Sequence, residues 1–254
     1  MIDVLSRKET DRLLERKARL SAWLAARPQL AARLRVLRTW QAERLARTYA
    51  DLRADPQGEG AVDFFLTDLY GPRDLTRRDA ELRRAWGVLR RTLPPFMRAV
   101  LALAIELEVL SEELDLDVAR HLPPGQITPE SYARAYRAAG RPEARRRQIE
   151  LTLEVGRRLA RAVRMPLVGR ALRAARTPAR MAGFGLLQDF LERGFAAFAR
   201  MPSAAPLLAA IRERETAFMS SLLAGTPGDP VAAADGGPAT AVNQKLPGGR
   251  RRPR

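Results

Sequence analysis

A run of carboxylates and the chain's one histidine lie on a single predicted helix, residues 95–121. Its large apolar residues form a narrow stripe, and Glu106, Glu113 and Asp117 fall at the margin of this stripe, with His121 on the same side if the helix continues. Partly buried carboxylates need a partner. That partner is either a metal ion, in a carboxylate-based enzyme or metalloprotein, or a set of arginines on a neighbouring helix. Di-iron bundles use two Glu-x-x-His motifs and this chain has none, so ion pairing is favoured.

A second kind of chemistry is suggested by residues 141–180, where twelve arginines stand against three glutamates. On a helical wheel, residues 142–164 place a wide apolar face inward and a strip of charge outward. Glu150 and Glu154 can pair at i,i+4 with Arg146 and Arg158, which leaves other arginines without a partner on their own helix. The candidate anion-binding residues are Arg147, Arg157, Arg161, Arg164, Arg170 and Arg173.

Clustered arginines raise the local positive potential and bind oxyanions. The candidate partners are therefore an acidic protein, a nucleic acid or an anionic membrane surface, and the alternative is a solvated helix face in an arginine-biased chain. The sequence has no zinc finger, RNP-like aromatic strand or basic zipper. We predict a non-catalytic interaction or regulatory module that binds an acidic partner. A carboxylate-based enzyme or metalloprotein on the acidic helix and a membrane-surface binder are the alternatives.

Residues 61–74, AVDFFLTDLYGPRD, combine aromatic, acidic and turn-forming residues. Phe64, Phe65 and Leu69 are predicted to anchor a short helix that ends at Gly71-Pro72. We expect the polar residues that follow to form a structural corner between helices. They are Asp68, Tyr70, Arg73 and Asp74.

Other chemistry is limited by what the chain lacks. With 0 cysteines it has no disulfide, thiolate metal site or cysteine nucleophile, and 1 histidine leaves little room for multi-histidine sites. No Gly-x-Ser-x-Gly, Walker or dinucleotide-binding pattern occurs in a suitable context. We expect no cofactor.

The elements that position these residues are predicted to be helices. Apolar residues recur at spacings of three and four, without the alternation of a half-buried strand, so the predicted fold is all-α, a single bundle of about eight helices. Thr128-Pro129 and Thr177-Pro178 have the order of an N-cap followed by a proline at the first helical position. Gly140 and Gly225 are predicted to be C-terminal caps.

The predicted helical domain spans residues 1–224, and residues 1–55 form a semi-independent hairpin or one helix kinked at Pro28. Residues 225–254 are rich in glycine, proline and arginine and too poor in large apolar residues to fold, so we predict a disordered tail. The first residues lack a signal-peptide pattern, and no apolar run reaches the length of a membrane span. The expected location is cytoplasmic, and the sequence leaves the oligomeric state open.

Four segments carry a resemblance to a protein family. They are the FFLTDLYGPRD motif at 64–74, SYARAY at 131–136, RRQIEL at 146–151 and LQDFLERGF at 187–195. Together they resemble an uncharacterised family of bacterial, mainly proteobacterial, helical proteins, over about residues 1–224. The resemblance implies a helical fold and a bacterial cytoplasmic setting. Since that family has no known activity, cofactor or substrate, it implies no functional residue.

Overall fold

Eleven helices and no strand make up the described part of this computed structural model, which covers residues 6–56, 58–65 and 76–226. The all-α prediction is confirmed. The helices outnumber the eight or so expected, because α3 (Ala50–Ala54) and α4 (Glu59–Phe64) are too short to show a helical period. The others are α1 (Arg7–Ala25), α2 (Pro28–Thr48), α5 (Thr76–Thr92), α6 (Pro95–His121), α7 (Pro129–Ala139), α8 (Pro142–Ala162), α9 (Pro166–Met181), α10 (Gly185–Arg200) and α11 (Ala205–Ala224).

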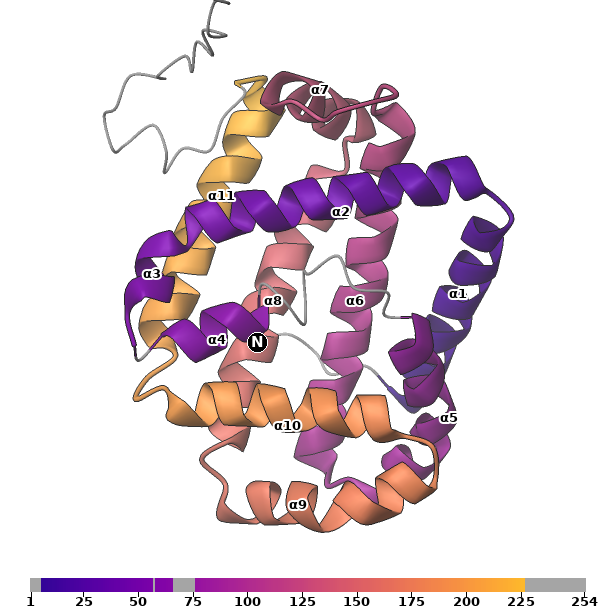
Figure 1. Ribbon diagram of the computed structural model, residues 1–254, viewed down its shortest axis with the longest axis vertical. Helices are drawn as coiled ribbons and strands as arrows, with labels where there is room; N and C mark the ends of the chain where they lie inside the picture. Colours follow the sequence, from indigo (N-terminus) through magenta and orange to yellow (C-terminus); the bar gives the residue numbers. More distant parts are fainter. Residues whose placement is uncertain (1–5, 57, 66–75, 227–254) are drawn as a thin grey trace, which may run out of the picture.

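The longest helix, α6, is the centre of the arrangement and contacts α1, α2, α7 and α8. In Figure 1, α6, α8 and α11 run upright, while α2 crosses them in the upper half and α10 crosses them in the lower half. Helix α9 lies below α10 and forms the lower edge of the molecule. The acidic helix of the sequence analysis is therefore interior, and the second half of the arginine-rich segment is peripheral.

Helix ends follow the predicted capping chemistry at several positions. Thr128 is the N-cap of α7, and its hydroxyl accepts a hydrogen bond from the Ser131 amide. Gly140 (φ +64°) and Gly225 (φ +83°) end α7 and α11 in backbone conformations that favour glycine. Pro28 is the first residue of α2, so residues 7–48 form two helices and not one kinked helix.

The prediction that Thr177-Pro178 begins a helix is wrong, because Pro178 lies inside α9. Proline has no N–H to donate to the carbonyl four residues earlier, here that of Ala174. Ala174 and Pro178 are both on the exposed side of α9, where water can hydrate the Ala174 carbonyl. The interruption is tolerated close to the helix end for that reason.

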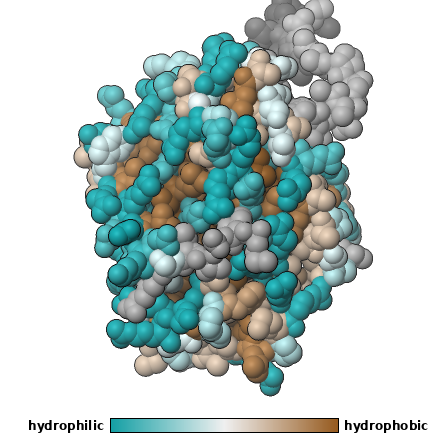
Figure 2. All heavy atoms as spheres, turned by 180° about the vertical axis from the view of Figure 1, so that it is seen from behind, coloured by the Kyte–Doolittle hydropathy of each residue, from teal (hydrophilic) through white to brown (hydrophobic). Residues whose placement is uncertain are grey.

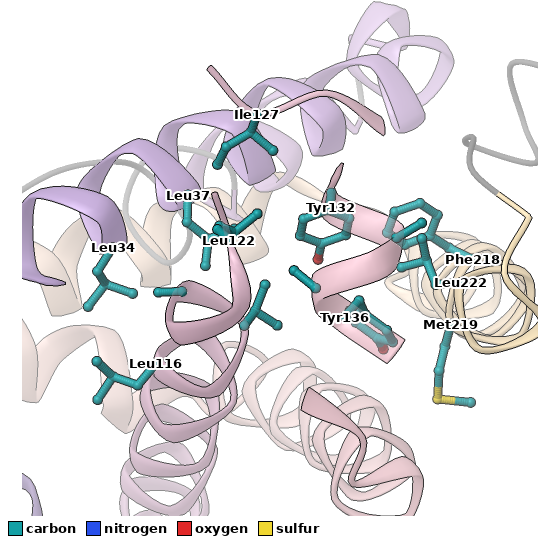
Figure 3. Close-up of a cluster of buried hydrophobic side chains, with 14 residues drawn as sticks. Leu34, Leu37, Leu116, Leu122, Ile127, Tyr132, Tyr136, Phe218, Met219 and Leu222 are labelled. Carbon is teal, nitrogen blue, oxygen red and sulfur yellow. The ribbon is translucent and has the colours of Figure 1, made fainter. Parts of the chain in front are cut away.

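Three apolar clusters hold α6 in place, one of them with α8 alone and two with several helices. The first joins α2, α6, α7 and α11 and includes Leu37, Leu116 and Phe218 (Figure 3). Within it, the rings of Trp40 and Tyr132 stack at a centroid distance of 4.2 Å. The second joins α1, α5, α6 and α10. The middle and the C-terminal half of α6 are thus buried against helices from distant parts of the sequence.

The first two helices pack on the rest of the described chain, since α1 contacts α5 and α6 and α2 contacts α6. The division into a domain of residues 1–224 with a semi-independent hairpin, followed by a tail, stays a prediction. Asp68, Tyr70, Arg73 and Asp74 lie outside the described residues. Within those residues no single helix is long and apolar enough to cross a membrane, while α10 and α11 pass such a test only as a pair bent by 105°.

Candidate functional site

The carboxylates predicted to sit at the margin of the acidic helix face arginines from other helices. Glu106 accepts hydrogen bonds from Arg147 of α8 at 2.8 and 3.2 Å. Glu113 pairs with Arg16 of α1, and Asp117 accepts a hydrogen bond of 2.9 Å from Arg141, just before α8. All three carboxylates therefore pair with arginines from other parts of the chain, as the sequence analysis favours.

His121 does not join these residues in a common site. It is exposed, in the last turn of α6. Within the described ranges, no group of three His, Cys, Asp or Glu side chains is arranged so that it could hold a metal ion. The four residues proposed as an alternative metal or catalytic centre are thus divided between a charged helix interface and an exposed helix end.

The remaining carboxylates of α6 extend the same charged interface. Lys17 of α1, whose side chain is 8% exposed, pairs with Glu108. Arg38 of α2 lies 3.5 Å from Glu112 and 3.7 Å from Asp115. Cations of α1, α2 and α8 therefore converge on the acidic side of α6, and these pairs favour one arrangement of the four helices.

Of the six candidate arginines, three have polar partners. Arg147 pairs with Glu106 as described. Arg157 donates to Glu154 on the same helix at 2.8 Å. Arg164 donates to the carbonyls of Met201 and Pro202 at 2.6 and 2.7 Å. The prediction that Arg157 has no partner on its own helix is wrong, because Glu154 accepts hydrogen bonds from both Arg157 and Arg158.

Glu154 is held in its charged form by this pairing. Burial by itself would raise the pKa of its carboxyl, but the hydrogen bonds from Arg158 and Arg157 bring the pKa below its ordinary value. Arg157 is therefore committed to a local ion pair and is a poor candidate for binding an external anion.

The other three candidates, Arg161, Arg170 and Arg173, are exposed and have no hydrogen-bonded or ion-paired acid within the described residues. Arg161 is in the last turn of α8, and the other two lie on α9. We call these three residues the free arginine set. They are the part of the predicted strip that remains available to an external anion.

Helix α9 is fixed to α10 by a packed face and by two ion pairs. Arg176 makes two hydrogen bonds to Glu192, and Arg180 donates to Asp189 at 3.0 Å. Gly169 packs so closely that a Cβ atom there would lie 2.9 Å from the ring of Phe195. These contacts fix the position of α9 on α10, and hence the positions on the helix at which its free arginines project.

The Arg176–Glu192 pair gives the protein an expected pH dependence. Hydrogen bonds from Arg176 and Gln188 lower the pKa of Glu192 from 4.5 to about 2. A depressed folded-state pKa means that the stabilisation is fully present above pH 4.5 and is lost as the pH falls toward 2. We expect Glu192→Gln to flatten the fall in the free energy of unfolding across this window, as measured by urea denaturation at a series of pH values. Arg176→Gln should flatten the same window, and curves parallel to the wild type would contradict the assignment.

Apolar side chains are exposed on and beside α9. Leu167 is 69% and Met181 85% exposed, with Met165 at 41% and Leu186 at 43%. Figure 2 shows brown and pale side chains between teal ones at the lower end of the molecule, the end at which α9 lies in Figure 1. Exposed apolar groups that gather in one place mark interaction surfaces more often than scattered ones do.

Two hollows on the described surface are open to solvent. One, of about 740 Å³, lies between α5, the end of α9 and the start of α10, and Glu81 at its wall accepts a hydrogen bond of 2.9 Å from the Leu187 amide. The other, of about 390 Å³, lies between α8 and α11, with Arg157 and Arg212 in its lining. In the first hollow the buried carboxylate caps the start of α10, which is a structural role.

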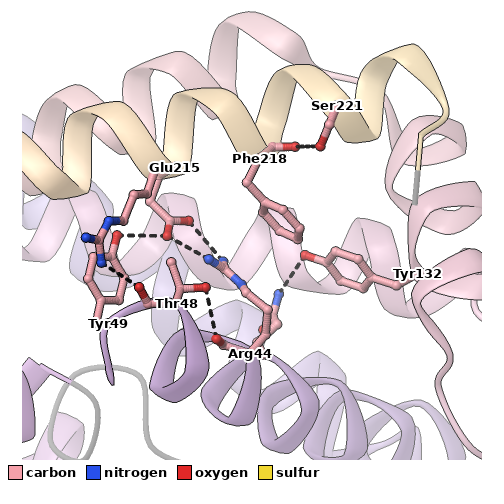
Figure 4. Close-up of polar contacts among 9 residues, drawn as sticks. Arg44, Thr48, Tyr49, Tyr132, Glu215, Phe218 and Ser221 are labelled. Atoms are coloured by element: carbon pink, nitrogen blue, oxygen red, sulfur yellow. Dashed lines mark hydrogen bonds and ion pairs between the residues drawn. The ribbon is translucent and has the colours of Figure 1, made fainter. Parts of the chain in front are cut away.

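A buried polar network between α2 and α11 was not predicted. Arg44 makes hydrogen bonds of 2.6 and 2.9 Å to Glu215, and Tyr49 donates to the same carboxylate at 2.9 Å (Figure 4). Arg145 is also buried, donates to the Leu114 carbonyl and lies over the Tyr136 ring. In a chain rich in arginine, nothing in the sequence marks these two as the buried ones.

Comparison with known families decides where this helical arrangement belongs. Residues 11–229 match the model of a family described as Domain of unknown function (DUF8198). The chain belongs to this family. No curated protein and no solved structure matches it. The matched residues include the charged interface of α6 and the free arginine set, and the family description assigns a ligand to neither. The residues of this DUF8198 member are therefore the basis for its proposed function.

Proposed function

We propose that the protein is a non-catalytic binding module that engages an acidic protein partner through the free arginine set. The observation that supports this most directly is the difference in pairing within residues 141–180. Arg147, Arg157 and Arg176 are joined to carboxylates, whereas the free arginine set has none. Exposed guanidinium groups without an internal anion can bind carboxylates bidentately at little structural cost.

The free arginines also occupy a stable position. Arg170 and Arg173 lie three residues apart on a helix that Arg176 ties to α10, so the helix itself needs little ordering when a partner binds. Electrostatic complementarity at such a surface raises the association rate and selects acidic partners.

The test is binding of fluorescently labelled poly-L-glutamate to the full chain, followed by anisotropy across a salt series. The variant Arg161→Glu, Arg170→Glu, Arg173→Glu should bind at least about tenfold more weakly, because three attractive contacts become repulsive. Binding by the wild type should also weaken as salt is added. These positions are chosen over Arg157 and Arg164, whose reversal would disturb internal contacts.

A matched control carries the same change of charge elsewhere. Arg35, Arg47 and Arg134 are exposed on α2 and α7, at the upper end of Figure 1, far from α9. Reversing these three should leave the affinity nearly unchanged. Equal losses in the two triple variants would show a response to net charge alone and would reject the proposed site. Tighter, site-dependent binding of labelled RNA than of poly-L-glutamate would reassign the partner to nucleic acid.

An anionic membrane surface is a second candidate, favoured by the exposed Leu167 and Met181 beside the arginines. Sedimentation with vesicles that contain phosphatidylserine separates this candidate from the first. Association with vesicles that is lost on arginine reversal, without binding to poly-L-glutamate, would support it.

A further inference from the structure

The outward side of α9 has a regular pattern that extends the proposed function. Residues 167, 171, 174, 178 and 181 are all exposed and are spaced by four, three, four and three positions, so they form one stripe along the helix. The members of this outward stripe are Leu167, Ala171, Ala174, Pro178 and Met181. No charged residue interrupts it.

The stripe is low in its middle and raised at its two ends. The large side chains of Leu167 and Met181 stand at its two ends, about 21 Å apart at 1.5 Å per residue. Ala171 and Ala174 lie between them, and small residues allow a second helix to approach to an interaxial distance of about 8 Å. The stripe is therefore suited to a helix that contacts the alanines and packs its own side chains against the two large residues.

Charge is confined to one flank of the stripe. Arg170, Arg173, Arg176 and Arg180 project to the same side on a wheel of about 100° per residue, while the other flank carries Val168 and Ala175. Arg176 and Arg180 are bound to carboxylates of α10, and Arg170 and Arg173 remain available. A partner on the stripe thus meets positive charge along one of its edges.

We infer that the outward stripe of α9 binds an amphipathic helix of a partner protein, with carboxylates along the edge that faces Arg170 and Arg173. This inference rests on the proposed function and specifies the partner's secondary structure and charge. The complementarity of charge is the reason to assign an acidic occupant. A second copy of this chain would bring the same two arginines to the interface, and both copies carry a net charge of +16.

A lipid surface fits the stripe less well. Helices that lie on membranes present a broad and continuous face of large apolar residues. Here only two large side chains project, and they are separated by alanines. Such a stripe offers little apolar area to insert but good contact for a helix.

The test is selection of a displayed library of helical peptides of about 20 residues, randomised among apolar, acidic and basic residues, against the full chain. The enriched peptides should be acidic and should carry apolar residues at helical spacing. The variant Leu167→Ser, Met181→Ser should bind them at least about tenfold more weakly, since these two large side chains supply most of the apolar area that the stripe can bury. Both residues are highly exposed, so the fold should be unaffected, which circular dichroism checks.

The control is Val36→Ser, Val88→Ser, which changes two exposed apolar residues on other helices and should bind the selected peptides like the wild type. If the selected peptides are acidic but lack apolar residues at helical spacing, and if Leu167→Ser, Met181→Ser binds them like the wild type, the helix inference is overturned. The proposed function then stands. No enrichment would overturn the helix inference, while the poly-L-glutamate titration would still decide the proposed function. Enriched peptides unaffected by reversal of the free arginine set would overturn both. Loss of phosphatidylserine-vesicle binding in Leu167→Ser, Met181→Ser, without any selected helix, would replace the partner helix by a membrane.

Discussion

Replacing Glu215 by glutamine should lower the free energy of unfolding by about 3 to 5 kcal/mol. The side chain of Arg44 is 8% exposed, and Glu215 is the carboxylate that neutralises it through two hydrogen bonds. Burial alone lowers the pKa of Arg44, but the adjacent carboxylate outweighs this effect and raises the pKa above its ordinary value. The arginine therefore stays charged, and glutamine leaves that charge uncompensated in the protein interior.

Unfolding curves in guanidinium chloride measure this loss of stability, and Glu213→Gln is the matched control. Glu213 is exposed on the same helix, two residues away, so its replacement should change stability by about 0.5 kcal/mol or less. The double change Arg44→Met, Glu215→Leu should recover most of the loss, because an apolar pair needs no neutralisation. A Glu215→Gln variant as stable as the Glu213→Gln control would show that water or another group already solvates Arg44.

The sequence predicted the helices well because their signals are local. Apolar spacing, the Thr128 cap and the glycines at 140 and 225 each act within one or two turns, and the structure confirms them. Thr177-Pro178 misled for a physical reason. A proline on a solvent-exposed helix face costs less than one on a packed face, and the sequence does not reveal which face Pro178 occupies.

The candidate sites were harder to predict because pairing between helices depends on tertiary packing. The sequence favours pairing of Glu106 with an arginine of a neighbouring helix but does not say which one, and it places Arg147 in an anion-binding strip; the structure joins the two in one ion pair. Glu113 likewise pairs with Arg16 of α1, and Asp117 pairs with Arg141, the residue that precedes α8. The two predicted sites therefore meet at the Glu106–Arg147 pair. What remains of the strip is the free arginine set, which local pairing rules could not separate from its neighbours.

Contact between α6 and α8 gives the second large expected effect. Leu151 of α8 is 0% exposed and packs with Leu103 and Val155 in an apolar cluster beside the charged interface. Leu151→Ala should lower the free energy of unfolding by about 2 to 5 kcal/mol through lost burial and the cavity it leaves. Arg147→Ala, one turn earlier on α8, should cost only about 1 kcal/mol, because its side chain is 35% exposed and water can replace it beside Glu106.

These two variants separate the contribution of apolar burial to the α6–α8 contact from the contribution of the Arg147–Glu106 ion pair. If apolar burial supplies the stability, the loss in Arg147→Ala stays small at all salt concentrations, and the loss in Leu151→Ala is unchanged by salt. A loss in Arg147→Ala that equals the loss in Leu151→Ala would instead make the charged interface the main source of stability. In that case Arg147 would be needed chiefly for folding, which agrees with its place outside the free arginine set.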